Sequence, residues 1–207
     1  PYVLMRRESA SIEVIAAPVL RGSRYGGKPI YYSDVIVHAD SGYTSFSDLR
    51  GCSWAYNEKV SQSGYGITRH TLLTLGETNG FFSEVIHVGW HQKAIQAIVD
   101  RTIDATAIDS QVLAIELAQN PILAHSIKII DTLGPSTIQP VVVKSHLSSD
   151  LKSTLQTVFT SLGDDTQIRP ILDATEIDHF TPIDDSAYDD IRAMQMLAEK
   201  ENFLQIG

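Results

Sequence analysis

Two serine hydroxyls and a glycine lie together in the segment Ser61-Gln62-Ser63-Gly64-Tyr65, directly before a stretch with helical spacing. Hydroxyls hydrogen-bond oxyanions, and the first backbone N–H groups of a helix have no partner within the helix. The helix dipole adds about 0.3–1 kcal/mol in favour of a nearby anion, and glycine lets the backbone approach the anion closely. A serine that only caps the helix explains the same residues. This chemistry therefore predicts either an anion site or a helix cap.

Two further junctions of the same kind place titratable side chains at helix starts. His91 follows Val88-Gly89-Trp90, and Asp109 precedes Ser110 at the end of another apolar run. An imidazole can donate a hydrogen bond to an oxyanion or, when protonated, offer it a positive charge. A carboxylate repels an anion unless it accepts a proton from the ligand or pairs with a ligand amine. The alternative role of Asp109 is to cap its helix. Together the three junctions favour one shared site for a small oxyanion.

The elements that must position these residues alternate along the chain between residues 41 and 139. We predict strands at 52–56, 83–88, 103–108 and 126–130, and helices at 64–75, 91–100 and 110–118. This β-α-β order favours an α/β fold, with a mostly parallel sheet and helices packed on its faces. Ligands bind beyond the carboxyl ends of the strands in such sheets, and the three junctions lie at those ends.

Two extended apolar segments, residues 31–37 and 140–144, lie on either side of this alternating block. We predict that they are strands crossing between two lobes, with the hinge near residues 34–39 and 134–140. Residues 39–139 then form lobe 2. Residues 1–38 and 140–207 form lobe 1, which ends in helices near residues 150–162 and 188–197.

Composition excludes several classes of protein. The 207 residues are 43% hydrophobic and 20% charged, which is ordinary for a globular protein. The net charge of -9 repels nucleic acid and anionic membranes, so we predict neither as a partner. No apolar run approaches the roughly 20 residues that span a bilayer, so an integral membrane protein is not predicted. The single cysteine, Cys52, cannot form an intrachain disulfide, and no His or Cys spacing indicates a metal site or another cofactor.

At these residues the sequence resembles the substrate-binding proteins of phosphate/phosphite/phosphonate ABC importers. The similarity covers nearly the whole chain, and its most specific part is the Ser-x-Ser-Gly loop with the downstream His91. It also includes Asp48-Leu49-Arg50-Gly51, Gly89-Trp90-His91, residues 103–109, Phe180-Thr181-Pro182 and residues 188–192. The resemblance implies a two-lobed, type II periplasmic-binding-protein fold and an ABC transporter permease as partner. It implies a periplasmic or extracytoplasmic location, with a lipid anchor as one alternative.

The resemblance also implies roles for individual residues. Ser61, Gln62 and Ser63, with the helix that they open, would hold the oxygens of the ligand, and His91 would add a contact. Tyr2 matches an aromatic position that lines the cleft. Asp109 would serve one of the acidic positions that meet a ligand amine, whereas Gln139 stands where a second acidic residue is found, so recognition of an amine stays open. The predicted substrate-binding residues are Tyr2, Ser61, Gln62, Ser63, Gly64, Tyr65, His91, Asp109 and Gln139.

The beginning of the chain departs from the family pattern. Residues 1–5, Pro1-Tyr2-Val3-Leu4-Met5, form an apolar run without a cap or turn and are predicted as a strand. Family members have a strand, a helix and a further strand before the matching segment. We therefore expect lobe 1 to lack its N-terminal β-α-β portion, and we expect other sequence, a partner or a second copy of the chain in a homo-oligomer to complete it.

Two other functions fit the same residues. Ser61 or Ser63 as nucleophile, with His91 as base and Asp109 as orienter, would make a hydrolase triad, although the chain has no Gly-x-Ser-x-Gly elbow. A two-lobed domain can also be the ligand-sensing part of a regulator or sensor kinase. The prediction is a solute-binding protein without catalytic activity. It captures phosphate, phosphite or a phosphonate by hinge closure for an ABC importer.

Overall fold

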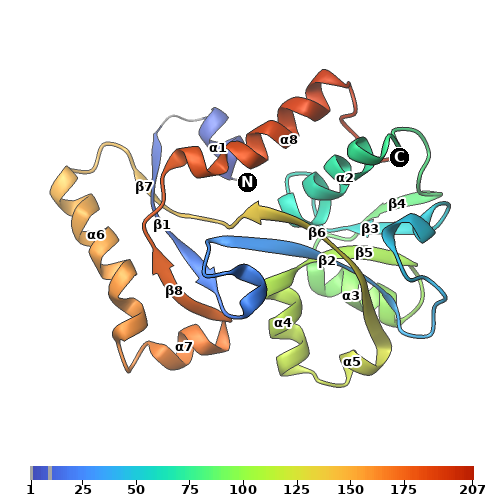
Figure 1. The fold of residues 1–207 in the computed structure, drawn as a ribbon, viewed down its shortest axis with the longest axis horizontal. Coiled ribbons are helices and arrows are strands. Elements are labelled where there is room, and N and C mark those ends of the chain that lie inside the picture. The colour runs from blue at the N-terminus through green and yellow to red at the C-terminus, as the bar shows by residue number, and fades with distance from the viewer. Residues whose placement is uncertain (1, 9–10) are drawn as a thin grey trace. The chain divides into compact units, whose positions relative to one another are not determined.

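The computed structural model describes residues 2–8 and 11–207, which pack into two compact units (Figure 1). Unit 1 contains the described residues up to Tyr31 together with Ser136–Arg192, and unit 2 contains Tyr32–Pro135 and Ala193–Gly207. Three elements continue from one unit into the other along the chain: β2 (Ile30–His38), β6 (Ile127–Thr137) and α8 (Asp189–Lys200).

The sheet of unit 2 holds β3 (Ser53–Tyr56), β4 (Glu84–His87) and β5 (Ala105–Asp109), and its strand order is β4-β3-β5-β2-β6. β3 pairs in parallel with β4 and with β5, which confirms the predicted parallel arrangement for these strands. β2 instead pairs antiparallel with β5. The chain reaches β2 from unit 1 and not through a helix that packs on this sheet. β2 therefore has no crossover connection of the kind that parallel strands need.

Alternation along the strands of unit 2 divides its core into two layers. Val35, Val37, Trp54 and Tyr56 point to one face and pack against α2 (Ile67–Leu75). The intervening side chains Ile36 and Ala55 point to the other face, where they pack against α3 (His91–Val99) and α4 (Ser110–Gln119). Successive residues of a strand point to opposite faces, so each strand buries both sets of apolar side chains. The predicted helices therefore cover both faces of the sheet.

Unit 1 is built on an antiparallel sheet. Its order is β7-β1-β8, formed by β1 (Ile12–Leu20), β7 (Val141–Lys144) and β8 (Ile177–Thr181). β7 and β8 are each antiparallel to β1, so they run in the same direction. The helices α6 (Ser149–Ser161) and α7 (Arg169–Ala174) connect them, and α6 packs on β1 and β8 (Figure 1). This is a crossover connection with one antiparallel strand inserted between its two strands.

Residues 140–144 do not cross between the units as expected. As β7 they pair with β1 inside unit 1, from Ile12 opposite Lys144 to Ala16 opposite Val141. The longer β6 contains the boundary instead, between Pro135 and Ser136. A short run of valines predicts a strand but not its partner, because pairing depends on residues far away in the sequence.

The prediction of a strand at residues 1–5 is wrong for the residues that the structure describes, and Pro1 lies outside them. Tyr2–Glu8 form the helix α1. Tyr2 and Val3 are buried against Tyr188 and Ile191, and the ring centroids of Tyr2 and Tyr188 are 4.6 Å apart. Short apolar runs do not distinguish strand from helix, and contacts with the chain more than 180 residues later decide this case.

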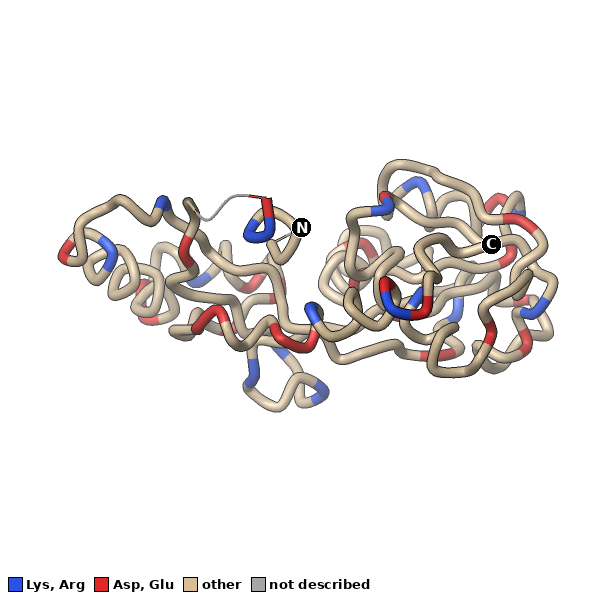
Figure 2. Tube along the Cα trace, turned by 90° about the horizontal axis from the view of Figure 1, so that it is seen from above, with Lys and Arg blue, Asp and Glu red and all other residues tan. Residues whose placement is uncertain are grey.

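Short helical segments complete the described chain: η1 (Ser23–Tyr25), η2 (Phe46–Leu49), η3 (Gln62–Gly66), α5 (Leu123–Ser126), η4 (Leu162–Asp164) and η5 (Asp185–Tyr188). Basic and acidic residues are interspersed along both units, as Figure 2 shows, within a net charge of -9. Among the described residues, no helix has the length and apolar character needed to cross a membrane.

Candidate functional site

Two of the three predicted junctions meet in unit 2. The Oγ atom of Ser63 lies 3.2 Å from Nε2 of His91, and the Oγ atoms of Ser61 and Ser63 are 3.4 Å apart. Ser61 is the N-cap of the following helical turn, because its Oγ accepts a hydrogen bond from the backbone N–H of Gly64 at 3.1 Å. The structure thus brings two hydroxyls and one imidazole together at a helix start.

Parallel pairing of β3 with β4 explains this meeting. The pairing continues past both strands, because Val88 N donates to Tyr56 O at 2.9 Å and Gly89 N donates to Asn57 O at 3.1 Å. The loops that leave the carboxyl ends of two neighbouring parallel strands therefore run side by side. One loop leads to Ser61 and Ser63, and the other opens α3 with His91 as its first residue.

The loop enters its helix through a π-helical turn. η3 covers Gln62–Gly66 and continues without a break into α2, and the N–H of Gly66 donates to Ser61 O, five residues earlier, at 2.9 Å. Single π-turns of this kind are frequent at functional sites. The helical run of residues 62–75 places its N-terminal end, with the positive end of its dipole, at the serine hydroxyls.

Asn57 belongs to the same cluster, although the sequence did not single it out. Its Nδ2 lies 3.3 Å from Nε2 of His91, and a Cβ added to Gly64 would lie 1.9 Å from its Oδ1. Gly64 is therefore required for close packing against the Asn57 amide and not for a positive φ. The one sequence signal was that Asn57 directly follows a strand, at the edge where ligands collect.

Burial determines the charge state of His91. Loss of solvent around the imidazole lowers its pKa to about 4, so the ring is neutral at physiological pH. Its Nδ1 atom is buried and has no hydrogen-bond partner within the described part of the chain. Nε2 is the ring atom that faces Ser63 and Asn57.

This geometry is not that of a hydrolase triad. A triad needs a group on Nδ1 that orients the imidazole, and no described residue bonds to Nδ1 of His91. Asp109, the expected orienter, instead caps α4: its Oδ1 accepts from the N–H of Gln111 at 2.9 Å. An imidazole with a pKa of about 4 is also a weak base for removing a serine proton.

Three other predicted residues, Gln62, Tyr65 and Asp109, belong to unit 2. Gln62 is buried, and its Nε2 donates to Sδ of Met194 at 3.2 Å. Tyr65 lies in the core of unit 2, with its ring 4.9 Å from that of Tyr56, and its hydroxyl accepts from the N–H of Ile206 at 3.0 Å. Asp109, at the end of β5, is buried.

The remaining two predicted residues, Tyr2 and Gln139, belong to unit 1. The Tyr2 hydroxyl donates to the carboxylate of Asp185, and burial, with this hydrogen bond and the nearby negative charge, raises the pKa of Tyr2 to about 12. Gln139 is exposed in the segment between β6 and β7. Within the residues that the structure describes, no group of three or more His, Cys, Asp or Glu side chains could hold a metal ion.

The fold defines a class of protein. Solved structures with the same fold are two-lobed, type II periplasmic binding proteins, and a binding protein component of an ABC phosphonate transporter from Pseudomonas aeruginosa is one of them. It aligns with a TM-score of 0.80 and 18% identity, over 96% of this chain and 66% of its own. PhnD1 from Prochlorococcus marinus, solved in complex with methylphosphonate, aligns with a TM-score of 0.81 and 19% identity, over 97% and 75%.

XAC2383 from Xanthomonas citri, solved with chloride and with ATP, has a TM-score of 0.72 and 17% identity in both structures. The chain covers 74% and 77% of these two structures, so it spans about three quarters of their length. At these identities, the likeness shows the fold alone.

The sequence profile of one family, "ABC transporter, phosphonate, periplasmic substrate-binding protein", matches residues 1–188. The chain belongs to this family of periplasmic proteins. Its members bind a small-molecule substrate and pass it to a transporter, and they are binding proteins and not enzymes.

Proposed function

We propose that this chain binds a small oxyanion, namely a phosphonate, phosphite or phosphate, on Ser61, Ser63 and His91. The convergence of these three side chains at the start of one helical run carries the proposal. The family and the methylphosphonate bound by PhnD1 support this ligand class.

Helix capping and anion binding are compatible at Ser61. Its Oγ accepts the hydrogen bond from Gly64 N through a lone pair, and its proton remains available to a ligand oxygen. A serine hydroxyl has one proton and two acceptor sites, so the cap turns Ser61 into an oriented donor. The same residue then satisfies a backbone N–H and contributes to the anion site.

Ser63 becomes a donor in the same way. In the tautomer with the proton on Nε2, His91 donates to Ser63 Oγ, 3.2 Å away, and the hydroxyl proton of Ser63 points to the ligand. Rotation of the Asn57 amide then places its oxygen as an acceptor beside the same N–H. A neutral imidazole, which its burial favours, is sufficient for this arrangement.

We also infer that the two compact units are the two lobes of the binding protein and that they close on the ligand. β2, β6 and α8 link the units along the chain, so they would be the hinge. Tyr2 and Gln139 would contact the bound ligand from unit 1, and the closed state would be the form that a permease recognises. Completion of lobe 1 by a second copy of the chain and attachment through a lipid stay predictions.

Substitution of Ser63 tests the site. We expect Ser63→Ala to weaken binding of methylphosphonate, phosphite or phosphate by about 1–3 kcal/mol, because a charge-assisted hydrogen bond is lost. Calorimetry on the wild-type protein would rank these anions against sulfate and acetate. Ser83→Ala, which removes an exposed hydroxyl outside the cluster, is the matched control. Unchanged affinity in Ser63→Ala would place the site elsewhere, and tighter binding of acetate than of any phosphorus oxyanion would refute the ligand class.

A further inference from the structure

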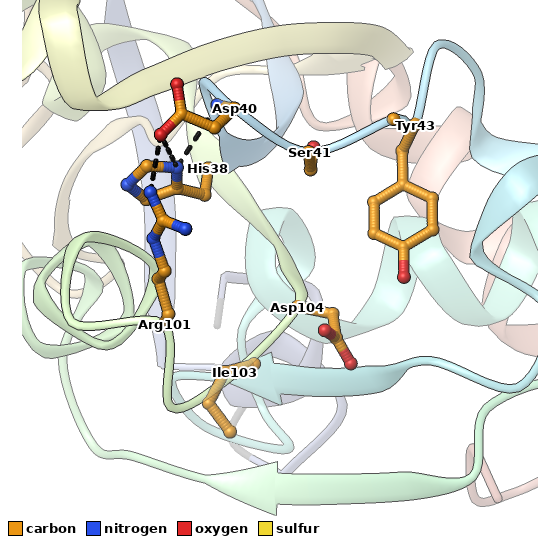
Figure 3. Close-up of a pocket in the computed structure, with 8 residues that line it drawn as sticks. His38, Asp40, Ser41, Tyr43, Arg101, Ile103 and Asp104 are labelled. Carbon is orange, nitrogen blue, oxygen red and sulfur yellow. Dashed lines mark hydrogen bonds and ion pairs between the residues drawn. The ribbon is translucent and has the colours of Figure 1, made fainter.

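A cavity lies in unit 2, at the end of the sheet opposite to the Ser61–His91 cluster. It measures about 250 Å³ and is lined by residues from two segments, 38–43 and 101–104 (Figure 3). β5 begins at Ala105, the residue after Asp104, and ends at Asp109 at the other end of the sheet. α3 begins at His91 and ends at Val99, two residues before Arg101. A strand of five residues spans roughly 16 Å, so the two places are separate.

Two carboxylates and one guanidinium line the cavity. Asp40 pairs with Arg101, with Oδ2 and Nη2 2.5 Å apart, so their charges cancel. Nδ1 of His38 lies 3.1 Å from the backbone N of Asp40 and 3.8 Å from its carboxylate. The carboxylate of Asp104 has no cation beside it in the cavity lining, so two carboxylates face one guanidinium.

Asp104 accepts structural hydrogen bonds, but these bonds use only part of the acceptor capacity of its carboxylate. Ser53 donates to it through its backbone N–H at 2.8 Å and through its hydroxyl at 2.7 Å, and both bonds go to Oδ2. A carboxylate has two oxygens with about four acceptor sites in total. Ser53 therefore holds the Asp104 carboxylate in position, and the carboxylate keeps acceptor sites for a ligand.

The rest of the lining suits the organic part of a ligand. Figure 3 shows Tyr43 and Asp104 on one side of the cavity, and His38, Asp40 and Arg101 on the other. A hydrogen bond with Cys52, together with burial, raises the pKa of Tyr43 to about 12, so its ring stays neutral and can face a cation. Ile103 adds an apolar surface. Ser41, also in the lining, has a buried hydroxyl oxygen with no hydrogen-bond partner in the described chain.

We propose that this cavity binds a small organic ammonium ion, with its cationic head at Asp104 and Tyr43 and its carbon atoms on Ile103. A bare metal ion fits less well, because no three of the described His, Cys, Asp and Glu side chains converge as ligands, whereas hard divalent cations need six or more oxygens. The volume suits a small molecule, since liquid water occupies about 30 Å³ per molecule and the cavity equals roughly eight of them. This site is independent of the proposed oxyanion site.

Titration with ethanolamine hydrochloride at constant ionic strength tests the proposal, followed by calorimetry and by amide shifts in NMR spectra. We expect saturable binding at millimolar concentrations, with shifts confined to residues 38–43, 53 and 101–104. Asp104→Asn keeps an oxygen for Ser53 but removes the charge, and it should weaken binding about tenfold or more. Asp100→Asn, whose side chain bonds to Gln96 Nε2 on α3 outside the cavity lining, should leave binding unchanged.

Three outcomes would overturn the proposal: no saturation, equal loss in Asp104→Asn and Asp100→Asn, or shifts centred on other residues. If Asp104→Asn fails to fold, Asp40→Asn serves in its place, because its carboxylate is 73% exposed and its removal leaves Arg101 uncompensated beside the cavity. That variant should also weaken ethanolamine binding, and unchanged affinity would likewise refute the site.

Discussion

The side chain of His91 is a donor or acceptor at physiological pH and not a cation. Its ring is adjacent to Ser63 Oγ and the Asn57 amide, while burial lowers its pKa to about 4 from an ordinary value of 6.5. At the proposed site, hydroxyls, backbone N–H groups and the helix start would therefore attract the oxyanion. This is the arrangement by which a protein with a net charge of -9 can hold an anion locally.

The lowered pKa of His91 also predicts how stability depends on pH. Between pH 6.5 and about 4 the unfolded chain binds a proton that the folded chain does not, so stability falls as the pH falls through this window. His91→Gln should flatten this part of the curve when the free energy of unfolding is measured in urea. Burial also lowers the pKa of His70. The stability of His91→Gln should therefore still fall somewhat as the pH falls.

His146→Gln is the control for this measurement, because its side chain is exposed. Its curve should follow that of the wild type. Parallel curves for wild type and His91→Gln would show that His91 titrates alike in the folded and unfolded chains.

At the scale of elements, α4 depends on Asp109 for its first turn. Oδ1 of this buried carboxylate accepts the N–H of Gln111, so Asp109→Ala should destabilise the protein by about 0.5–2 kcal/mol, as loss of an N-cap does. Asp109→Asn retains the cap and should cost much less. Urea denaturation of both variants measures the difference.

The same pair of variants separates capping from recognition of a ligand amine. If Asp109 meets the amine of an aminophosphonate, Asp109→Asn will weaken aminoethylphosphonate binding and leave methylphosphonate binding unchanged. Equal affinities of Asp109→Asn and wild type for both ligands would restrict Asp109 to the cap.

At the scale of the whole molecule, three elements carry the chain between two compact units. We expect methylphosphonate to lower the radius of gyration in small-angle X-ray scattering, because only a closed state would contact the ligand from both units. Ser63→Ala at the same ligand concentration should keep the larger radius. Tight binding with an unchanged radius would refute hinge closure and leave the anion site intact.

Trp90 offers a second readout of the same event. It is 65% exposed and directly precedes His91, whereas Trp54, the other tryptophan, is fully buried in the core of unit 2. Fluorescence changes on ligand binding would therefore come from Trp90 and would be absent in Trp90→Phe. This separates events beside the proposed anion site from changes in the core.

The sequence alone predicts the local elements of unit 2 and the positions of Ser61, Ser63 and His91 at their ends. Alternating apolar residues define β3, β4 and β5, helical spacing defines α2, α3 and α4, and Gly76 ends α2 with a φ of 73°. Such patterns are local, since a strand or helix shows its own periodicity. The same order of elements places Ser61 and His91 at neighbouring strand ends, where the structure brings their cluster together.

The tertiary structure decided what depends on distant partners. α1 is helical because Tyr2 and Val3 pack against residues near 190, and β7 finds its place by pairing with β1. The last residues, 193–207, belong to unit 2, whereas the sequence predicts them in lobe 1; in unit 2 the N–H of Ile206 donates to the hydroxyl of Tyr65. Asn57 reached the site through a bond to an imidazole 34 residues later. None of these contacts leaves a periodic trace in the sequence, because each joins segments that only the folded chain brings together.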